Sequence, residues 1–226
     1  MAIKLLSRGV IIIFCMTLLG CSTDDENLYQ DFEDLSLHEK EGIDYDINHQ
    51  SAHSAVLIMA IHGGSIEPGT SELVQTVSKG SFNYYDFAGM KQTDNYDLHI
   101  SSLEFDEPEA VKMVEESKYT VSIHGYESED KNTYVGGRDT ALASNIKNEL
   151  QKNGFGVTES PKKFAGKEKE NITNRNNRSK GVQIEISAAQ RKAFFEGGDF
   201  TSANRENKTD EFYDYAKAVQ KGIKHK

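Results

Sequence analysis

The sequence has only two cysteines, Cys15 and Cys21, among its 226 residues. Both lie in an N-terminal segment that we interpret as an export signal and its lipidation site. We therefore expect no free cysteine in the folded domain. This excludes a disulfide framework, a thiolate metal site and a cysteine nucleophile. The domain must be held together by packing or by a metal ion.

Positive charge is also in short supply, because 26 basic residues face 36 acidic ones and the formal net charge is −10. Such a charge disfavours nucleic acid as a partner, since binding to phosphates needs a basic surface. The charge is unevenly spread. Residues 24–46 carry ten acids and one base, and we interpret residues 21–50 as an acidic tether. Residues 162–192 carry nine bases and three acids, which suits either a solvated surface or a binding surface for an anionic substrate.

No apolar run reaches the length of about 20 residues that a membrane-spanning helix needs. The N-terminal run at residues 10–19 follows Lys4 and Arg8, and it ends in Leu-Leu-Gly-Cys at residues 18–21. This arrangement is typical of a bacterial lipoprotein. We predict that residues 1–20 are a signal peptide and that Cys21 carries a lipid. The protein would then be extracytoplasmic and anchored to a membrane of the cell envelope. The alternative is an ordinary secretory signal in which Cys21 occurs by chance.

The rest of the chain contains no internal repeat and no low-complexity tract, so we expect one catalytic α/β domain over residues 51–226. Expected strands alternate with expected helices, and this favours a single mixed, mostly parallel sheet with helices on both faces. A cap at Ser187 with Gln190 predicts a further short helix, and residues 158–180 have the polarity of a long loop. The expected strands are 55–61, 96–103, 119–123 and 181–186, and the main helices are 70–80, 107–116, 139–152 and 210–221.

Three of these strands have a polar residue where an apolar one would be expected. His62 follows the first strand, His124 follows the third, and Glu185 lies near the end of the last. Because the carboxyl ends of neighbouring parallel strands meet at one edge, we expect these side chains to lie together. Imidazoles and a carboxylate without a thiolate suit Zn²⁺ with a fourth position open to water. Such an ion lowers the pKa of its bound water to about 7.

Further carboxylates complete the predicted centre. The Gly63-Gly64 pair permits a turn that would bring Glu67 back to the same ion, and Glu72 is a rival ligand. Glu185 would act as the general base.

Each of these residues also has a plainer, structural interpretation. A histidine after an apolar strand is commonly a hydrogen-bonded residue of the core or rim, and Glu185 could face outward from a half-buried sheet. His99, between Leu98 and Ile100, is expected to face solvent.

Three segments together resemble the poly-γ-glutamate hydrolase family of bacteria and their phages: 60-AIHGGSIEPGTSE-72, 122-SIHGY-126 and 181-GVQIEIS-187. The resemblance covers most of residues 50–222. It implies a zinc carboxypeptidase-like fold, a zinc ion and cleavage of γ-glutamyl amide bonds in poly-γ-glutamate. On this resemblance, His62, Glu67 and His124 match the zinc ligands and Glu185 matches the base. In the wider zinc carboxypeptidases the first histidine and its glutamate are three residues apart, whereas here they are five apart.

Every unit of such a polymer carries a free carboxylate, which the planar fork of arginine can bind with two hydrogen bonds. We therefore expect Arg138, Asn174 and Arg175 to bind substrate. The Asn174-Arg175 pair resembles the Asn-Arg pair of zinc carboxypeptidases, although its place in chain order differs. The alternative for the two arginines is a solvated surface.

Two other functions remain open at this stage. A γ-glutamyl linkage also occurs in peptidoglycan stem peptides, so the chain could be a peptidoglycan hydrolase or carboxypeptidase. It could also be a non-catalytic lipoprotein that binds an anionic polymer. The combination of His62, His124 and Glu185 argues against the binding protein, because binding alone needs no general base.

Overall fold

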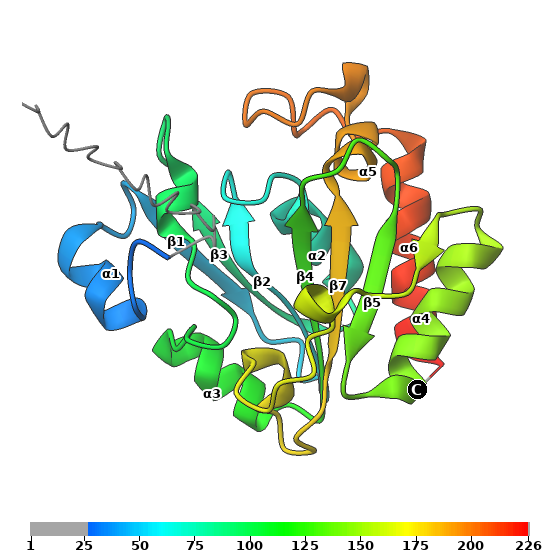
Figure 1. Cartoon of the computed structure of the whole chain (residues 1–226), viewed down its shortest axis with the longest axis horizontal. Coiled ribbons are helices and arrows are strands. Elements are labelled where there is room, and N and C mark those ends of the chain that lie inside the picture. The colour runs from blue at the N-terminus through cyan, green and yellow to red at the C-terminus, as the bar shows by residue number, and fades with distance from the viewer. Residues whose placement is uncertain (1–26, 226) are drawn as a thin grey trace, which may run out of the picture.

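A seven-stranded sheet in the order β1-β3-β2-β4-β7-β5-β6 runs through the computed structural model, which describes residues 27–225 (Figure 1). The predicted signal peptide at residues 1–20 and the predicted lipidation site Cys21 lie outside the described residues. The strands are β1 (Tyr45–Gln50), β2 (Val56–Gly64), β3 (Asn83–Gly89), β4 (Tyr119–Tyr126), β5 (Thr133–Gly137), β6 (Val157–Thr158) and β7 (Val182–Ser187).

The centre of the sheet is parallel and its two margins are not. Strands β3, β2, β4 and β7 run parallel to one another. Strand β1 is antiparallel to β3 at one edge, and β5 is antiparallel to β7 toward the other. Figure 1 shows the arrowheads of β2, β4 and β7 at the same edge of the sheet and that of β5 at the opposite edge. The predicted mixed, mostly parallel sheet is confirmed.

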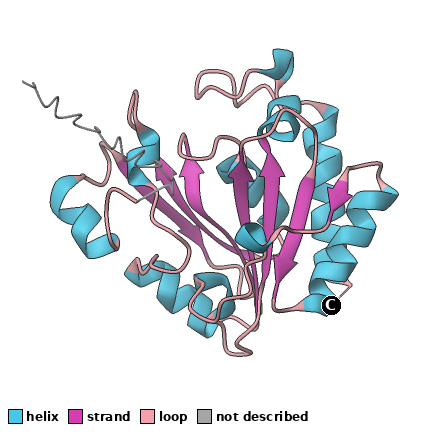
Figure 2. Ribbon diagram, in the orientation of Figure 1, coloured by secondary structure: helices cyan, strands magenta, loops and turns pink. Residues whose placement is uncertain are grey.

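Helices cover both faces of the sheet (Figure 2). On one face, α2, α4 and α6 enclose a core that contains Ile58, Ile123 and Ile184. On the other face, α1 and α3 pack over a second core that contains Leu57 and Met59. Because β2 is covered on both sides, its sequence is an almost uninterrupted apolar run. The helices are α1 (Phe32–His38), α2 (Thr70–Ser78), α3 (Pro108–Glu116), α4 (Thr140–Lys152), α5 (Ala188–Ala193) and α6 (Asp210–Lys224).

The prediction of an acidic tether over residues 21–50 is wrong for the part that the structure describes. Helix α1 and strand β1 occupy most of residues 32–50, and β1 pairs with β3 over its whole length. Leu35 and Tyr45 are buried among the apolar side chains of the second core. Their burial fixes the segment to the sheet, while its many acids remain on the outer surface. The folded domain therefore begins before residue 51.

The strand predicted at residues 96–103 is also wrong. The chain there forms a short 3-10 helix, η1 (Asn95–Leu98), and then runs without regular structure toward α3. Leu98 and Ile100 are both fully buried, so their alternation reflects two anchoring points of a loop. Within residues 27–225, no helix combines the length and the apolar character needed to cross a bilayer.

Candidate metal centre and active site

The direction of the His62 side chain is set by a β-bulge in β2. The register between β2 and β3 shifts between Ala60 and Gly63, because Ala60 lies opposite Asp86 and Gly63 lies opposite Ala88. One extra residue on β2 reverses the alternation of side chains beyond it. Gly63 consequently faces α2, and His62 points to the opposite face of the sheet. Without the bulge, His62 would take the face that Ala60 occupies.

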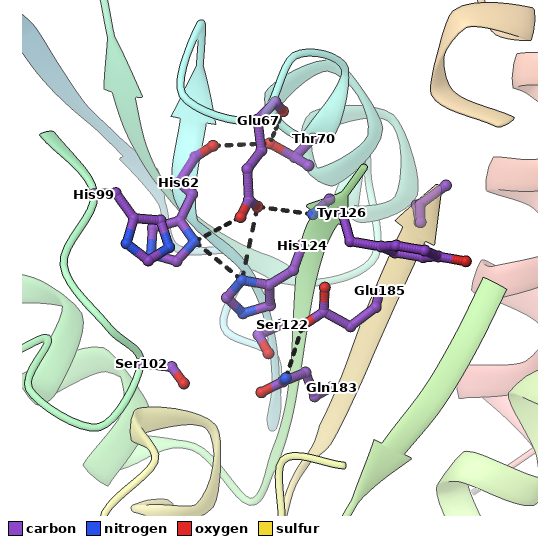
Figure 3. Close-up of polar contacts among 12 residues, drawn as sticks. His62, Glu67, Thr70, His99, Ser102, Ser122, His124, Tyr126, Gln183 and Glu185 are labelled. Atoms are coloured by element: carbon purple, nitrogen blue, oxygen red, sulfur yellow. Dashed lines mark hydrogen bonds and ion pairs between the residues drawn. The ribbon is translucent and has the colours of Figure 1, made fainter. Parts of the chain in front are cut away.

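His62, Glu67 and His124 converge on one another beside that bulge (Figure 3). His62 Nδ1 lies 3.0 Å from Glu67 Oε1 and 3.2 Å from His124 Nδ1. His124 Nδ1 lies 3.7 Å from Glu67 Oε2. All three side chains are at least nine-tenths buried. The structure therefore brings together the three residues that the sequence analysis predicts as ligands.

The hydrogen bonds around the cluster suit a metal ion. His62 Nε2 lies 2.8 Å from the carbonyl oxygen of Ile100, which can only accept, so Nε2 carries the proton of a neutral His62. The lone pair of Nδ1 then faces Glu67 Oε1, another acceptor, so either a second proton on His62 or a metal ion must lie between these two atoms. Donors bound to one tetrahedral zinc ion at roughly 2.1 Å lie roughly 3.4 Å apart, close to the distances between these atoms. The residues present fit a zinc ion.

His99 is a fourth candidate, which the sequence analysis placed in solvent. Its ring stacks on that of His62 at a centroid distance of 3.9 Å, and Tyr96 stacks on its other side at 4.9 Å. Ligand atoms of His62, Glu67 and His99 all lie within 4.8 Å of one another. No periodic signal in the sequence points to His99, because it lies in an irregular loop after η1.

The turn that returns Glu67 to His62 is fixed by a buried hydrogen-bond network. The Gly64 N–H donates to Ser71 Oγ at 2.6 Å, and Ser71 Oγ donates to Asp86 Oδ1 at 2.7 Å. A Cβ atom on Gly63 would lie 1.9 Å from Asp86 Oδ1, so only glycine fits there. The network ties the turn to α2 and β3, and this explains how the wider spacing between His62 and Glu67 is accommodated.

Glu67 is held from a second direction as well. The Gly125 N–H donates to Glu67 Oε2 at 2.8 Å, next to His124 on β4. Burial alone would raise the pKa of Glu67, but the charge of His62 and the hydrogen bond to it lower that pKa to about 2. Burial lowers the pKa of His124 to about 4, so that its ring is neutral and has a lone pair available. The ionised carboxylate of Glu67 and the neutral ring of His124 are in the protonation states that metal binding requires.

Glu185 stands beside His124, because the two residues are register partners on β7 and β4. Gln183 Nε2 donates to Glu185 Oε1 at 2.8 Å, and Asn171 Nδ2 donates to Gln183 Oε1 at 2.8 Å. This chain orients the carboxylate toward the cluster (Figure 3). Burial and the negative charge of Glu67 raise the pKa of Glu185 well above its ordinary value. A carboxyl group in this position can exchange a proton with a water molecule or substrate in the cleft.

A cleft of about 520 Å³ exposes these groups. Its lining includes His62, Glu67, His99, His124 and Glu185. Two cations also line it, Lys163 and Arg191, and the sequence analysis singled out neither. Their only sequence signal was their place in the basic stretch at residues 162–192.

The three residues predicted to bind substrate lie outside the lining of this cleft, and the structure does not bring them to the cluster. Arg138 follows β5, whose Gly137 lies opposite the first residue of β7, at the far edge of the sheet from the cluster. Asn174 is buried and bonds the backbone of Gly166, Glu168 and Gly181. Arg175 donates to three backbone carbonyl groups, those of Leu103, Phe105 and Glu170.

Glu72, the rival carboxylate, is engaged elsewhere. Its Oε1 accepts from Arg205 Nε at 2.8 Å, and the two side chains line a separate cavity with Asp86 and Ser71. Glu67 is thus the carboxylate that the fold brings to His62.

Comparison with known proteins agrees with this geometry. Residues 29–218 match the family described as poly-gamma-glutamate hydrolase. The chain belongs to this family. The UPF0714 protein YmaC of Bacillus subtilis (strain 168) is 42% identical over 208 residues, which cover 90% of this chain and 86% of YmaC. The predicted family membership and the prediction of a hydrolase are confirmed.

Two solved structures share the fold of this family member closely. A bacteriophage poly-gamma-glutamate hydrolase matches with a TM-score of 0.87 and 38% identity, over 88% of this chain and 98% of that one. The zinc-free form of YndL matches with a TM-score of 0.83 and 37% identity, again over 88% and 98% of the two chains. The zinc carboxypeptidase-like fold expected from the sequence is thereby confirmed.

The network beneath the turn gives a pH-dependent prediction. Burial raises the pKa of Asp86 to about 7, partly offset by the hydrogen bond from Ser71. Since the unfolded value is about 3.9, the folded chain binds the extra proton between about pH 4 and 7. The free energy of unfolding therefore falls as pH rises through this window. Asp86→Asn should remove this slope. The free energy of unfolding of Asp86→Asn minus that of the unaltered chain should therefore be roughly 3–4 kcal/mol larger at pH 8 than at pH 4.

Urea denaturation of the chelator-treated proteins at a series of pH values measures this difference. The exposed Asp130→Asn is the matched control and should follow the unaltered chain at every pH. Parallel stability curves for Asp86→Asn and the unaltered chain would contradict the predicted burial effect.

Proposed function

We propose that the chain is a zinc-dependent enzyme that hydrolyses the γ-glutamyl amide bonds of poly-γ-glutamate. The observation that carries this proposal is the convergence of His62, Glu67 and His124 in one cleft with Glu185 beside them. Two findings support it. The family is that of poly-gamma-glutamate hydrolases. The solved relative YndL is known in a zinc-free form.

His62, Glu67 and His124 would hold the zinc ion, and His99 is the alternative to His124 as the third ligand. We favour His124 because its Nδ1 atom is 3.2 Å from His62 Nδ1 and 3.7 Å from Glu67 Oε2. His62 would be kept in the required tautomer by its hydrogen bond to the Ile100 carbonyl group. When bound, zinc supplies a Lewis acid that polarises the amide carbonyl group and acidifies a water molecule.

Glu185 would move the proton in this reaction. Its carboxylate accepts a proton from the attacking water and then delivers it to the nitrogen of the departing amine. Burial raises the pKa of Glu185 and favours the protonated form that delivers the proton, whereas the charge of a bound zinc ion would lower this pKa and favour the ionised form that accepts it. Gln183 and Asn171 hold the carboxylate in line through both steps.

One prediction of this function concerns the proposed base, Glu185. Glu185→Gln keeps the shape of the side chain but cannot accept a proton, so the rate of polymer cleavage should fall by about 10²–10⁴. Chain-length analysis of poly-γ-glutamate after incubation measures the rate. Treatment with a chelator should abolish cleavage, and added Zn²⁺ should restore it.

Glu115→Gln, on the exposed face of α3, is the control and should cleave at the original rate. Cleavage by Glu185→Gln at the original rate would contradict the role of Glu185 as the base. Cleavage of peptidoglycan stems in place of the polymer would reassign the substrate while leaving the site unchanged.

The second prediction distinguishes the two candidate third ligands. His124→Ala should lose stoichiometric zinc after dialysis, because one of three protein ligands is gone. His99→Ala should retain zinc with an affinity weakened at most 10- to 100-fold, as for a residue that packs against a ligand. Elemental analysis of the purified proteins measures zinc per chain.

The exposed His53→Ala is the control and should keep its zinc. The reverse pattern, with zinc lost from His99→Ala and kept by His124→Ala, would make His99 the third ligand.

We also propose that the enzyme acts outside the cytoplasm while held to a membrane by a lipid on Cys21. The basis is the charged start, the short apolar run and the Leu-Leu-Gly-Cys sequence at residues 18–21. Cys21→Ser should therefore move the protein from the membrane fraction to the soluble extracytoplasmic fraction and abolish labelling with radioactive palmitate. Continued sedimentation of unlabelled Cys21→Ser with the membranes would reject the anchor.

A further inference from the structure

Three aromatic rings form a cluster on the side of Glu185 away from the imidazoles. Tyr126, Tyr134 and Phe164 come from β4, β5 and the 3-10 helix η2 (Lys162–Phe164). The Tyr126 ring lies 4.9 Å from that of Tyr134 and 5.1 Å from that of Phe164, and the last two are 5.7 Å apart. Tyr126 and Phe164 also line the cleft. Figure 3 shows the Tyr126 ring directed past Glu185 and away from His62 and His124.

Lys163 places a positive charge on this aromatic cluster. Its Nζ atom lies 4.5 Å from the centroid of the Phe164 ring, within the range of a cation–π contact. The side chain is exposed and lines the cleft.

The other cation in the cleft, Arg191, is already hydrogen-bonded to backbone carbonyl groups. Arg191 is only 2% exposed, and its guanidinium group donates to the carbonyl oxygens of Ile186, Pro68 and Tyr126. These bonds tie together the ends of β7 and β4 and the turn before α2. Among the described lining residues, Lys163 is therefore the cation that can meet a ligand.

The opposite end of the cleft is different. Beyond the imidazoles its described lining consists of Tyr96, Ser101 and Ser102, together with Ile66, and it contains no lysine or arginine. The exposed positive charge of the described lining is thus that of Lys163, beside the aromatic cluster.

We propose that Lys163, Tyr126 and Phe164 form a subsite for the glutamyl unit next to the bond that is cleaved. This inference rests on the proposed function. A γ-linked glutamyl unit has two methylene groups in its main chain and a free carboxylate on its α-carbon. The methylene groups pack on the faces of Tyr126 and Phe164. The carboxylate pairs with the Lys163 ammonium group, a compact charge that accepts either orientation of a flexible polymer.

The subsite makes Lys163 a determinant of specificity for anionic substrates, separate from the catalytic groups. Lys163→Gln should raise KM for poly-γ-glutamate about five- to tenfold and change kcat less than threefold. Lys163→Arg, which keeps the charge, should restore most of the affinity. The exposed neighbour Lys162→Gln lies outside the lining of the cleft and should leave both constants unchanged.

The decisive comparison uses steady-state kinetics on two matched γ-glutamyl oligomers, one with free α-carboxylates and one with every α-carboxylate converted to an amide. Lys163→Gln should lose affinity for the acidic oligomer only, and the KM of the unaltered enzyme for that oligomer should rise with salt more steeply than that of the variant. Equal losses on both oligomers, or no loss on either, would overturn the subsite.

The outcome also separates this inference from the function on which it rests. Cleavage of the polymer with unchanged KM in Lys163→Gln would reject the subsite and leave the proposed function standing. Absence of cleavage by the unaltered, zinc-supplemented enzyme would reject both.

Discussion

One extra residue in β2 determines whether the candidate metal ligands can meet. A strand alternates its side chains strictly, so a histidine two residues after Ala60 would point at helix α2. The bulge between Ala60 and Gly63 reverses that alternation and directs His62 toward β4. Gly63 then takes the crowded face, where no side chain fits between Asp86 and Ser71. The bulge, the glycine pair and the Ser71–Asp86 network are therefore parts of one local structure.

That local structure buries a carboxylate beside an imidazole, an arrangement that a cation stabilises. It buries Glu67 and brings His62 Nδ1 within 3.0 Å of the carboxylate. A buried carboxylate needs a positive partner, and because His62 Nε2 is bonded to the Ile100 carbonyl group, that partner is either a second proton on Nδ1 or a metal ion. The Gly125 N–H satisfies one carboxylate oxygen, and the other faces the imidazoles. A divalent cation would neutralise this arrangement, so the same contacts that fold the loop favour metal binding.

The sequence predicts the residues of this centre better than their surroundings. His62, His124 and Glu185 are visible because each interrupts an apolar strand of a buried parallel sheet. Their meeting then follows from the common direction of those strands. Arg138 was misplaced because composition does not reveal that β5 runs antiparallel to β7, which puts its end at the opposite edge. The tether was misjudged because a few buried residues, among them Leu35 and Tyr45, outweigh many solvated acids. The position of His99 near His62 could not be predicted, because an irregular loop shows no periodic pattern of apolar residues.

The basic stretch at residues 162–192 has a role that its charge alone does not reveal. Its Asn171 holds Gln183, and Gln183 holds Glu185, so this segment orients the carboxylate that we propose as the base. Its Lys163 and Phe164 form the wall of the cleft on the other side of the same carboxylate. Asn174, which looked like a ligand for substrate, bonds the backbone at Gly166 and Gly181 and keeps the segment folded against β7. One loop thus sets both the position of the base and the surface next to it. A change in its packing would alter catalysis and substrate binding together, whereas the exposed ammonium group of Lys163 can be altered alone.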